Sequence, residues 1–473
     1  MQNSEILLLI GEIWSAGLGD SIPANALRGF DMRCVLRICL LYSNNITMAS
    51  PCKLLMMGLL WFGASLDVMA SSVGCNDGFV QMHVDELVID VAPTHVDDTV
   101  NIQCALDAAV RLGIPIVRLE SDSYEIGHLS VEGFVGSFQG RTRAGTIVRV
   151  TDDAIECSAM HSLAMQSAVI KFVKGEPRLR YMTINANVPC RNGSILDAIV
   201  HFTGESSQAG NCEFDVIFGV VDRIAIDGKQ AAHDIRAAIS ATPEGHGCKD
   251  SLLGTFKLNR SMISNTSIGV ITSMKSGAQV DINFNEFHNN LKSVYLVDTN
   301  QNTTITTNEF FGDNTTEEDY FGVLVANVSD SPPASTRVIV HNNDFTIAAS
   351  NPERWSFGVS VRWIISKVSS IVSNNRFVLS GDHTYGLRYR NNSNAHVTAN
   401  RFNGSGARAI LVTGNGSVPV NGWTITANTG LAGFDAVDGE DIRLDYSTSD
   451  CIIGPGQGAT ILDNGENNTI LPQ

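Results

Sequence analysis

The chain has 473 residues, of which 44% are hydrophobic and 17% charged, and its mean hydropathy is +0.06. This composition excludes an intrinsically disordered chain, a collagen and a polytopic membrane protein. The formal net charge of -17 argues against nucleic acid as a partner unless a local basic patch exists. Asparagine is concentrated in one part of the chain, with 27 residues in 259–473 and 10 in 1–258. The two parts therefore follow different structural rules.

An apolar segment near the N-terminus indicates export. The run from Leu54 to Gly63 follows Lys53 and gives way to small residues around Ala70. It is too short to span a bilayer but fits the apolar region of a signal peptide, and a short core helix is the alternative. We expect residues 1–74 to be an N-terminal extension with the signal at about 48–70, and Met48 to be the start of translation. Residues 75–473 are then a single domain of a secreted, cell-surface or periplasmic protein.

The cysteines leave several arrangements open. Seven follow Ala70: Cys75, Cys104, Cys157, Cys190, Cys212, Cys248 and Cys451. An odd number in an exported protein leaves one without a disulfide partner. The sequence Ser72–Cys75 resembles a bacterial lipobox, and lipidation of Cys75 would leave six cysteines and give the protein its one membrane contact. The wide spacings argue against a zinc site.

The segment DDTVNIQCALDAAVRLG predicts an amphipathic helix over about 98–112. Apolar residues recur at helical spacing, acidic residues stand at the start, and Gly113 follows the end. A strand-like run from Ile114 to Leu119 comes next, and then Tyr124–Ile126.

A repeat marks the chain from about residue 259 to 473. Five segments carry Asn-x-Phe after a β-rich run: Asn285/Phe287, Asn308/Phe310, Asn343/Phe345, Asn375/Phe377 and Asn400/Phe402. A sixth, Asn428, lacks the aromatic residue. Repeats of this variable length, with short strands and no helix, predict a parallel β-solenoid whose stacked coils bury a continuous core. We expect each Asn to adopt the left-handed conformation at a coil corner and to bond the next Asn, and each Phe to fill one interior layer. A β-sandwich is the alternative, but it does not explain why Asn-x-Phe recurs at the same point of each repeat.

A second strand in each repeat carries a Gly or small residue before an inward position. When the repeats are aligned on that residue, their inward positions form one predicted column: Val270, Val294, Val323, Val359, Leu387 and Ile410. Between inward positions, Tyr295, Arg362, Arg388 and Arg390 then face outward. Because adjacent coils are about 4.8 Å apart, the three arginines form one basic cluster on an acidic protein. Arginine binds carboxylate and sulfate-like anions in a bidentate manner, so we predict binding of an acidic polysaccharide here. A solvated face neutralised by acids of the insert loops is the alternative.

Other titratable residues offer weaker signals. Glu286 and Glu309 lie between Asn and Phe of consecutive repeats and could be a hydrolytic carboxyl pair, or ordinary exposed strand residues. A lyase would need a base beside a cation, for which the candidates are Arg388, Arg390, Tyr295, Lys275 and His396. His246 stands in a Gly-His-Gly that occurs in polygalacturonases, but the accompanying motifs are absent and a turn histidine is the simpler interpretation. One acidic run could hold Ca²⁺ or be a solvated loop: Asp435, Asp438, Glu440, Asp441 and Asp445. No other cofactor or metal is expected.

The helix motif followed by solenoid coils resembles the right-handed parallel β-helix proteins of the pectin lyase-like superfamily, over about residues 85–470. The resemblance implies an all-β fold, a right-handed parallel β-helix whose N-terminal α-helix caps the open end of the coil. The superfamily includes polysaccharide lyases, glycoside hydrolases, sugar epimerases, phage tailspikes and non-catalytic adhesins, so the fold does not select a reaction.

Two functions are consistent with these features of the sequence. The first is an exported carbohydrate-active protein that binds or cleaves an acidic polysaccharide, with Arg362, Arg388, Arg390 and Tyr295 as binding residues and Arg388, Arg390, Tyr295, Glu286 and Glu309 as the catalytic candidates. The second is a non-catalytic surface or adhesin-like module, because no complete catalytic motif is present.

Overall fold

The computed structural model describes residues 75–76, 78–151, 157–159, 167–186, 190, 194–204, 215–228, 235–243, 252–274, 277–297, 302–314, 318–326, 337–362, 369–392, 394–414, 420–455 and 458–472. They belong to one compact unit, Gly74–Gln473. The predicted export signal, Met48, His246 and Lys275 lie outside these residues. No helix among the described residues is long and apolar enough to cross a membrane.

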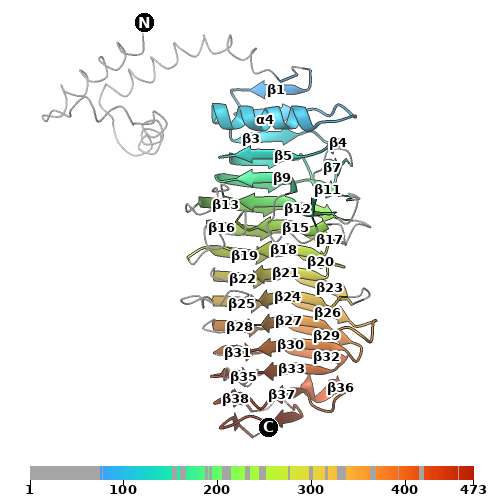
Figure 1. The fold of residues 1–473 in the computed structure, drawn as a ribbon, viewed down its shortest axis with the longest axis vertical. Helices are drawn as coiled ribbons and strands as arrows, with labels where there is room; N and C mark the ends of the chain where they lie inside the picture. The colour runs from blue at the N-terminus through green and yellow to red at the C-terminus, as the bar shows by residue number, and fades with distance from the viewer. Residues whose placement is uncertain are drawn as a thin grey trace, which may run out of the picture. The chain divides into compact units, whose positions relative to one another are not determined.

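This unit is a right-handed parallel β-helix, as the sequence predicted. The described strands form sheets of 15, 11 and 13 strands, and successive coils add one strand to each (Figure 1). Neighbouring strands are parallel, except that β1 pairs antiparallel with β2 and β8 (Ser158–Ala159) with β12. The alternative of a β-sandwich is therefore wrong.

The 15-stranded sheet consists of β1 (Val80–His83), β2 (Val88–Val91), β3 (Ile116–Leu119), β6 (Val135–Gln139), β10 (Glu176–Arg180), β13 (Asp215–Asp222), β16 (Leu252–Asn259), β19 (Gln279–Asn283), β22 (Asn302–Thr306), β25 (Arg337–His341), β28 (Ser369–Ser373), β31 (Ala395–Thr398), β35 (Thr424–Thr426), β39 (Ile452–Ile453) and β41 (Thr469–Ile470).

The 11-stranded sheet consists of β4 (Ser123–Ile126), β7 (Ile147–Val150), β11 (Thr183–Asn185), β14 (Ala225–Asp227), β17 (Met262–Ser264), β20 (Glu286–His288), β23 (Glu309–Asp313), β26 (Asp344–Ala348), β29 (Arg376–Ser380), β32 (Arg401–Gly406) and β36 (Asp435–Ala436).

The 13-stranded sheet consists of β5 (Leu129–Glu132), β9 (Ala168–Val173), β12 (Ser194–Thr203), β15 (Ile235–Ala241), β18 (Ile268–Thr272), β21 (Lys292–Val297), β24 (Tyr320–Ala326), β27 (Ser356–Arg362), β30 (Thr384–Arg390), β33 (Arg408–Thr413), β37 (Ile442–Leu444), β40 (Ile461–Asp463) and the side strand β8. A separate two-stranded sheet joins β34 (Val420–Asn421) to β38 (Thr448–Ser449), and a 3₁₀ turn, η5, spans Leu431–Gly433.

The predicted N-terminal helix is present as α4 (Thr99–Leu112). It lies across the first coils, and its buried face includes Ile102, Ala105 and Leu106 (Figure 1). Gly113 ends it in the left-handed conformation that glycine adopts without strain. The buried Asp98 carboxylate accepts the backbone N–H of Thr94 at 2.6 Å and of Glu125 at 3.0 Å. The second Asp of the motif therefore fixes the helix to the coil beneath it.

Disulfides hold the N-terminal part of this unit. Cys75 bonds Cys104 on α4, and Cys157 bonds Cys190. A sulfur in a disulfide has no valence left for a lipid thioether, so the expected lipid anchor at Cys75 is wrong for this structure. Cys451 is a buried free thiol, and burial raises its pKa to about 11.

The six repeat asparagines form a continuous ladder between the 15- and 11-stranded sheets. From Asn308 to Asn428, each amide oxygen accepts both the backbone N–H and the Nδ2 of the Asn in the preceding coil, at 2.9–3.0 Å. The amide oxygen of Asn285, the first in the series, accepts the backbone N–H of Ser261 at 2.9 Å. Each Nδ2 also donates to a carbonyl of the preceding coil, as Asn343 does to Ile305. These buried amides are thereby satisfied, and they bind each coil to the next.

The expected conformation of these asparagines is wrong in one respect. The left-handed residue is the one before each ladder Asn, such as Phe284, Asn342 and Asn374 with φ of 60°, 55° and 54°. The turn occurs at the exposed residue, so the ladder Asn can direct its amide into the corner.

The Asn-x-Phe aromatics form one interior stack, as predicted. Ring centroids from Phe287 to Phe402 are 4.6–5.1 Å apart with interplanar angles of 4–8°. The predicted inward column from Val270 to Ile410 is confirmed by strand register. The Gly before each inward residue has a steric cause: a Cβ on Gly358 would lie 2.7 Å from the ring of Phe377 and 2.6 Å from the carbonyl oxygen of Gly386.

Replacing a ladder residue should destabilise the fold strongly. Asn343→Ala leaves the N–H and Nδ2 of Asn308 without their acceptor, at an expected cost of about 3 kcal/mol or more in the free energy of unfolding. Asn342→Gly, at the exposed left-handed position next to it, should cost less than about 1 kcal/mol. Denaturant unfolding of both variants measures this. Equal losses would mean that the ladder does not hold the coils together.

Candidate functional site

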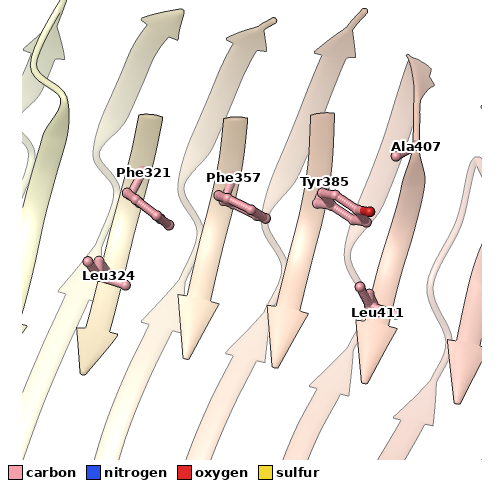
Figure 2. Close-up of a cluster of buried hydrophobic side chains, with 6 residues drawn as sticks. All are labelled: Phe321, Leu324, Phe357, Tyr385, Ala407 and Leu411. Atoms are coloured by element: carbon pink, nitrogen blue, oxygen red, sulfur yellow. The ribbon is translucent and has the colours of Figure 1, made fainter. Parts of the chain in front are cut away.

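Three aromatic rings lie on the outer face of the 13-stranded sheet. Phe321, Phe357 and Tyr385 are register partners on β24, β27 and β30. Their ring centroids are 5.0 and 5.4 Å apart, and the planes differ by 11° and 13° (Figure 2). In each of these strands, the glycine that follows the aromatic residue and the residue after that glycine both face the interior. The aromatic residue before them therefore points outward. Leu324 and Leu411 complete the buried cluster.

Two arginines lie over these rings. The Arg362 guanidinium carbon is 4.8 Å from the ring centre of Phe321 and 5.9 Å from that of Phe357. The Arg388 carbon is 5.1 Å from Phe357. A stacked guanidinium group is held by its flat face, and its N–H edges remain available for a planar anion. We call Phe321, Phe357, Tyr385, Arg362 and Arg388 the arginine–aromatic face.

Neither of these two arginines forms an ion pair within the described part of the chain, although the charge of Asp319 acts on both from a longer distance. The Nε of each guanidinium group is buried without a hydrogen-bond partner there. Burial lowers the pKa of both groups, and the charge of Arg388 lowers that of Arg362 further. Arginine stays charged at neutral pH all the same. Two half-buried like charges on a protein with a net charge of -17 require a reason other than folding.

The structure places the other predicted binding residues on the same sheet. Arg390 is exposed and is the register partner of Arg362. Tyr295, on β21, lies in the row that continues through Leu324 and Ser360 to Arg388, and it packs against the aromatic cluster. The four residues chosen from the sequence thus share one outward face.

The remaining candidates lie elsewhere. Glu286 and Glu309 are exposed register partners on the 11-stranded sheet, and His288 Nε2 lies 3.5 Å from Glu286 Oε2. His396 is on β31 of the 15-stranded sheet. The sequence could not separate the three sheets, and for this reason it grouped residues that the fold sets on different faces.

Described residues of two insertions in the repeats, at 312–320 and 350–355, contact each other beside the arginine–aromatic face. Asn314 Nδ2 donates to the carbonyl oxygens of Asn351 and Arg354 at 3.0 and 2.6 Å. Trp355, at the end of the second insert, lies with its ring centre 5.2 Å from that of Tyr385. The loops therefore extend the aromatic surface.

The acidic run does not assemble a Ca²⁺ site. Its side chains are bound by protein groups: Asp438 and Glu440 pair with the buried Arg408 at 2.7 and 3.2 Å, and Asp441 accepts the backbone N–H of Thr460 at 2.7 Å. Among the described residues no three His, Cys, Asp or Glu side chains converge as metal ligands.

A buried polar group on the N-terminal half of the same sheet was not predicted from the sequence. His201 on β12 is fully buried, is the register partner of Lys171 and Ser240, and has Nε2 3.1 Å from the carbonyl oxygen of Thr242. Its Nδ1 has no hydrogen-bond partner among the described residues. Burial lowers the pKa of His201 to about 4. The available signal was one histidine at an outward position of a mostly apolar strand.

No protein-family model and no curated protein matches this sequence. Solved structures with similar folds include the mannuronan C-5 epimerase AlgE4 A-module of Azotobacter vinelandii, with 13% identity, TM-score 0.44 and coverage of 80% of this chain and 94% of that one. The surface adhesin PfbA of Streptococcus pneumoniae has 14% identity, TM-score 0.38 and coverage of 71% and 88%. A polygalacturonase of Erwinia carotovora has 12% identity, TM-score 0.37 and coverage of 82% and 95%.

The chain has a right-handed parallel β-helix fold, as the sequence indicated. This fold supports several unrelated functions, so the function has to be inferred from the chain's own residues.

Replacing Arg362 or Arg388 should not weaken the fold. Arg388→Met and Arg362→Met keep a side chain on the rings and remove a half-buried charge, so the free energy of unfolding should stay constant or rise by about 1 kcal/mol. Arg408→Met is the matched control, because it leaves Asp438 and Glu440 without their partner and should cost about 3 kcal/mol. Denaturant unfolding compares the three. Losses as large for Arg388→Met as for Arg408→Met would make Arg388 a structural residue.

His201 should make stability depend on pH. Its pKa is about 6.5 in the unfolded chain and about 4 in the fold, so the unfolded chain binds more protons between these values. The contribution is complete above pH 6.5 and is lost toward pH 4, by about 3 kcal/mol in total. His201→Gln should therefore lose less stability than wild type between pH 7 and pH 4.5, as measured by urea unfolding. Identical losses would contradict the assignment.

Proposed function

We propose that this protein binds an acidic polysaccharide at the arginine–aromatic face. The observation that carries the proposal is the pair of half-buried arginines, Arg362 and Arg388, which form no ion pair with a carboxylate of the described residues and feel the charge of Asp319 only from a longer distance. Their buried Nε–H groups are donors without acceptors, and burying such donors costs free energy that a bound anion would recover. A uronate carboxylate accepts two parallel N–H bonds from a guanidinium edge.

The aromatic residues support a sugar ligand over an isolated anion. Trp355 packs against Tyr385 and is only partly buried, so it offers ring surface against which a sugar ring can pack. The coils repeat at about 4.8 Å, so equivalent side chains on consecutive coils suit a polymer that runs along the sheet. Arg390 lies beside Arg362 in register, on the same strand as Arg388, and adds a third positive charge to this surface.

The same contact can support cleavage by β-elimination. Neutralising the uronate carboxylate with Arg362, the arginine whose charge interacts with that of Tyr295, makes the neighbouring C5 proton more acidic. Tyr295 is the residue of this face that we assign as the base. The base takes the C5 proton, the C4–O4 bond breaks as the C4=C5 bond forms, and the leaving O4 takes up a proton from water. Glu286 and Glu309 take no part in this proposal, because they belong to another sheet.

A non-catalytic surface or adhesin-like module is the second candidate. It is favoured by the separation of the predicted carboxyl pair, Glu286 and Glu309, from the arginines, because the two groups belong to different sheets. Binding through Arg362 and Arg388 is common to both candidates. The two disulfides support an oxidising, extracytoplasmic location for either one.

The test is binding of the full chain to polyuronates, with dextran as the neutral polymer control. Arg362→Met with Arg388→Met should lower the affinity by about tenfold or more, because it removes charge-assisted hydrogen bonds. Arg376→Met with Arg401→Met, two exposed arginines of the 11-stranded sheet, should leave affinity unchanged and controls for net charge. Isothermal titration measures both.

Ultraviolet absorbance of unsaturated uronate products then separates the candidates. A signal that rises with wild type and vanishes with Tyr295→Phe establishes the lyase. Binding without such a signal supports the surface module. Equal affinity of the wild type and the Arg362/Arg388 variant for polyuronate would refute the proposed function.

A further inference from the structure

A second basic and aromatic surface lies at the corner between the 15- and 11-stranded sheets. Four consecutive coils place Tyr181, Arg223, Arg260 and Phe284 at the same corner position, directly after the register-paired residues Arg180, Asp222, Asn259 and Asn283. We call these four residues the corner ridge. The arginine–aromatic face is on the third sheet, so the two surfaces do not share residues.

The backbone at this corner makes large side chains costly. All four ridge residues have positive φ, of 55°, 56°, 49° and 60°. Residues other than Gly and Asn are strained by about 1 kcal/mol or more in this conformation. The later coils of the same column carry Thr307, Asn342, Asn374, Ala399 and Ala427. The corner therefore accepts small or amide side chains, and the four larger ones are an exception that folding does not require.

The side chains of the corner ridge are arranged as a surface. Arg223 Nη1 donates to the Tyr181 hydroxyl at 2.6 Å, and its guanidinium carbon lies 5.4 Å from the Tyr181 ring centre. Arg223 and Arg260 expose 44% and 56% of their side chains, and Phe284 is 55% exposed. The order along the axis is aromatic, arginine, arginine, aromatic.

The charge of this corner is only partly balanced. Asp222 lies between Arg223 and Arg260, but its oxygens are 3.9 and 3.6 Å from their nitrogens, which is longer than a hydrogen bond. Arg180 is its register partner, and the Arg180 Nε is buried without a hydrogen-bond partner among the described residues. In this part of the described chain, the single carboxylate of Asp222 thus lies beside three guanidinium groups. The net charge of the corner is therefore positive, although the protein as a whole is acidic.

We propose that the corner ridge is a second binding site for an acidic polysaccharide, separate from the arginine–aromatic face. The ligand lies parallel to the solenoid axis across four coils, a span of about 14 Å. Its carboxylate or sulfate groups bind the edges of Arg223 and Arg260, and its sugar rings pack on Phe284 and Tyr181 at the two ends. Charge complementarity and exposed rings favour an anionic glycan, and the site stands whether or not the proposed function of the other face is correct.

The test uses the full chain in the Arg362→Met/Arg388→Met background, in which the other face is disabled. Arg223→Asn with Arg260→Asn removes the two charges and keeps a residue that suits positive φ, as Asn342 and Asn374 do in the same column. Affinity for polygalacturonate and for heparin should fall about tenfold or more. Arg376→Gln with Arg401→Gln is the control of equal charge and should leave it unchanged. Phe284→Asn should lower affinity about threefold without changing its salt dependence.

If the variants unfold at the same temperature as the background protein, a loss of affinity reflects weaker binding and not a damaged fold. The proposal is overturned if the background variant does not bind either polymer, or if binding survives Arg223→Asn/Arg260→Asn. Tighter retention of single-stranded DNA than of both glycans would overturn the ligand class. Loss of binding in the corner variant alone, with the Arg362/Arg388 variant unaffected, would support the corner ridge and refute the proposed function.

Discussion

The asparagine ladder is the interaction on which the rest of this structure depends. The strands of adjacent coils stay in register only if the chain turns in the same way at the same corner of every coil. At a corner, backbone N–H and C=O groups have no strand partner. From Asn285 to Asn428, one amide per coil satisfies these groups and fixes the register of the next coil. The interior Phe stack, the small residues beside it and the alignment of the outward rows all follow from that register. The arginine–aromatic face therefore exists because the corner holds the rows in phase.

Outward and inward residues make different contributions to this molecule. Inward positions are filled by apolar residues whose size is set by neighbouring rings, as with Gly358 under Phe377. Outward positions are free to carry residues that folding does not favour, and Arg362 and Arg388 are such residues. The neighbouring Arg408 shows the contrast, because it is as buried as a core side chain and is paired with two carboxylates. The absence of such an ion pair at Arg362 and Arg388 within the described chain is the difference on which the proposed binding surface rests.

Much of the fold could be predicted because the repeat exposes it. Asn-x-Phe at variable spacing indicated stacked coils, and the Gly-Val alignment indicated which residues of each strand face outward, including Arg388. The sequence could not assign Glu286 and Arg388 to different sheets, since strand order around a coil depends on tertiary packing. It also placed the left-handed turn one residue late. The aromatic ladder from Phe321 to Tyr385 was missed although an aromatic residue precedes the Gly in three successive repeats, because a bulge reverses the direction that simple alternation predicts.

The position of the disulfides has a mechanical consequence. Each coil contacts only the coils before and after it, so tension along the axis is resisted by one set of inter-coil contacts at a time. The bonds Cys75–Cys104 and Cys157–Cys190 lock the helix and first coils against such tension, whereas the coils from Asn285 onward rely on hydrogen bonds and stacked rings. Under load the described domain should peel from its C-terminal side, coil by coil, and lengthen stepwise while its N-terminal part stays intact. A protein exposed to shear could thus yield gradually rather than rupture at once.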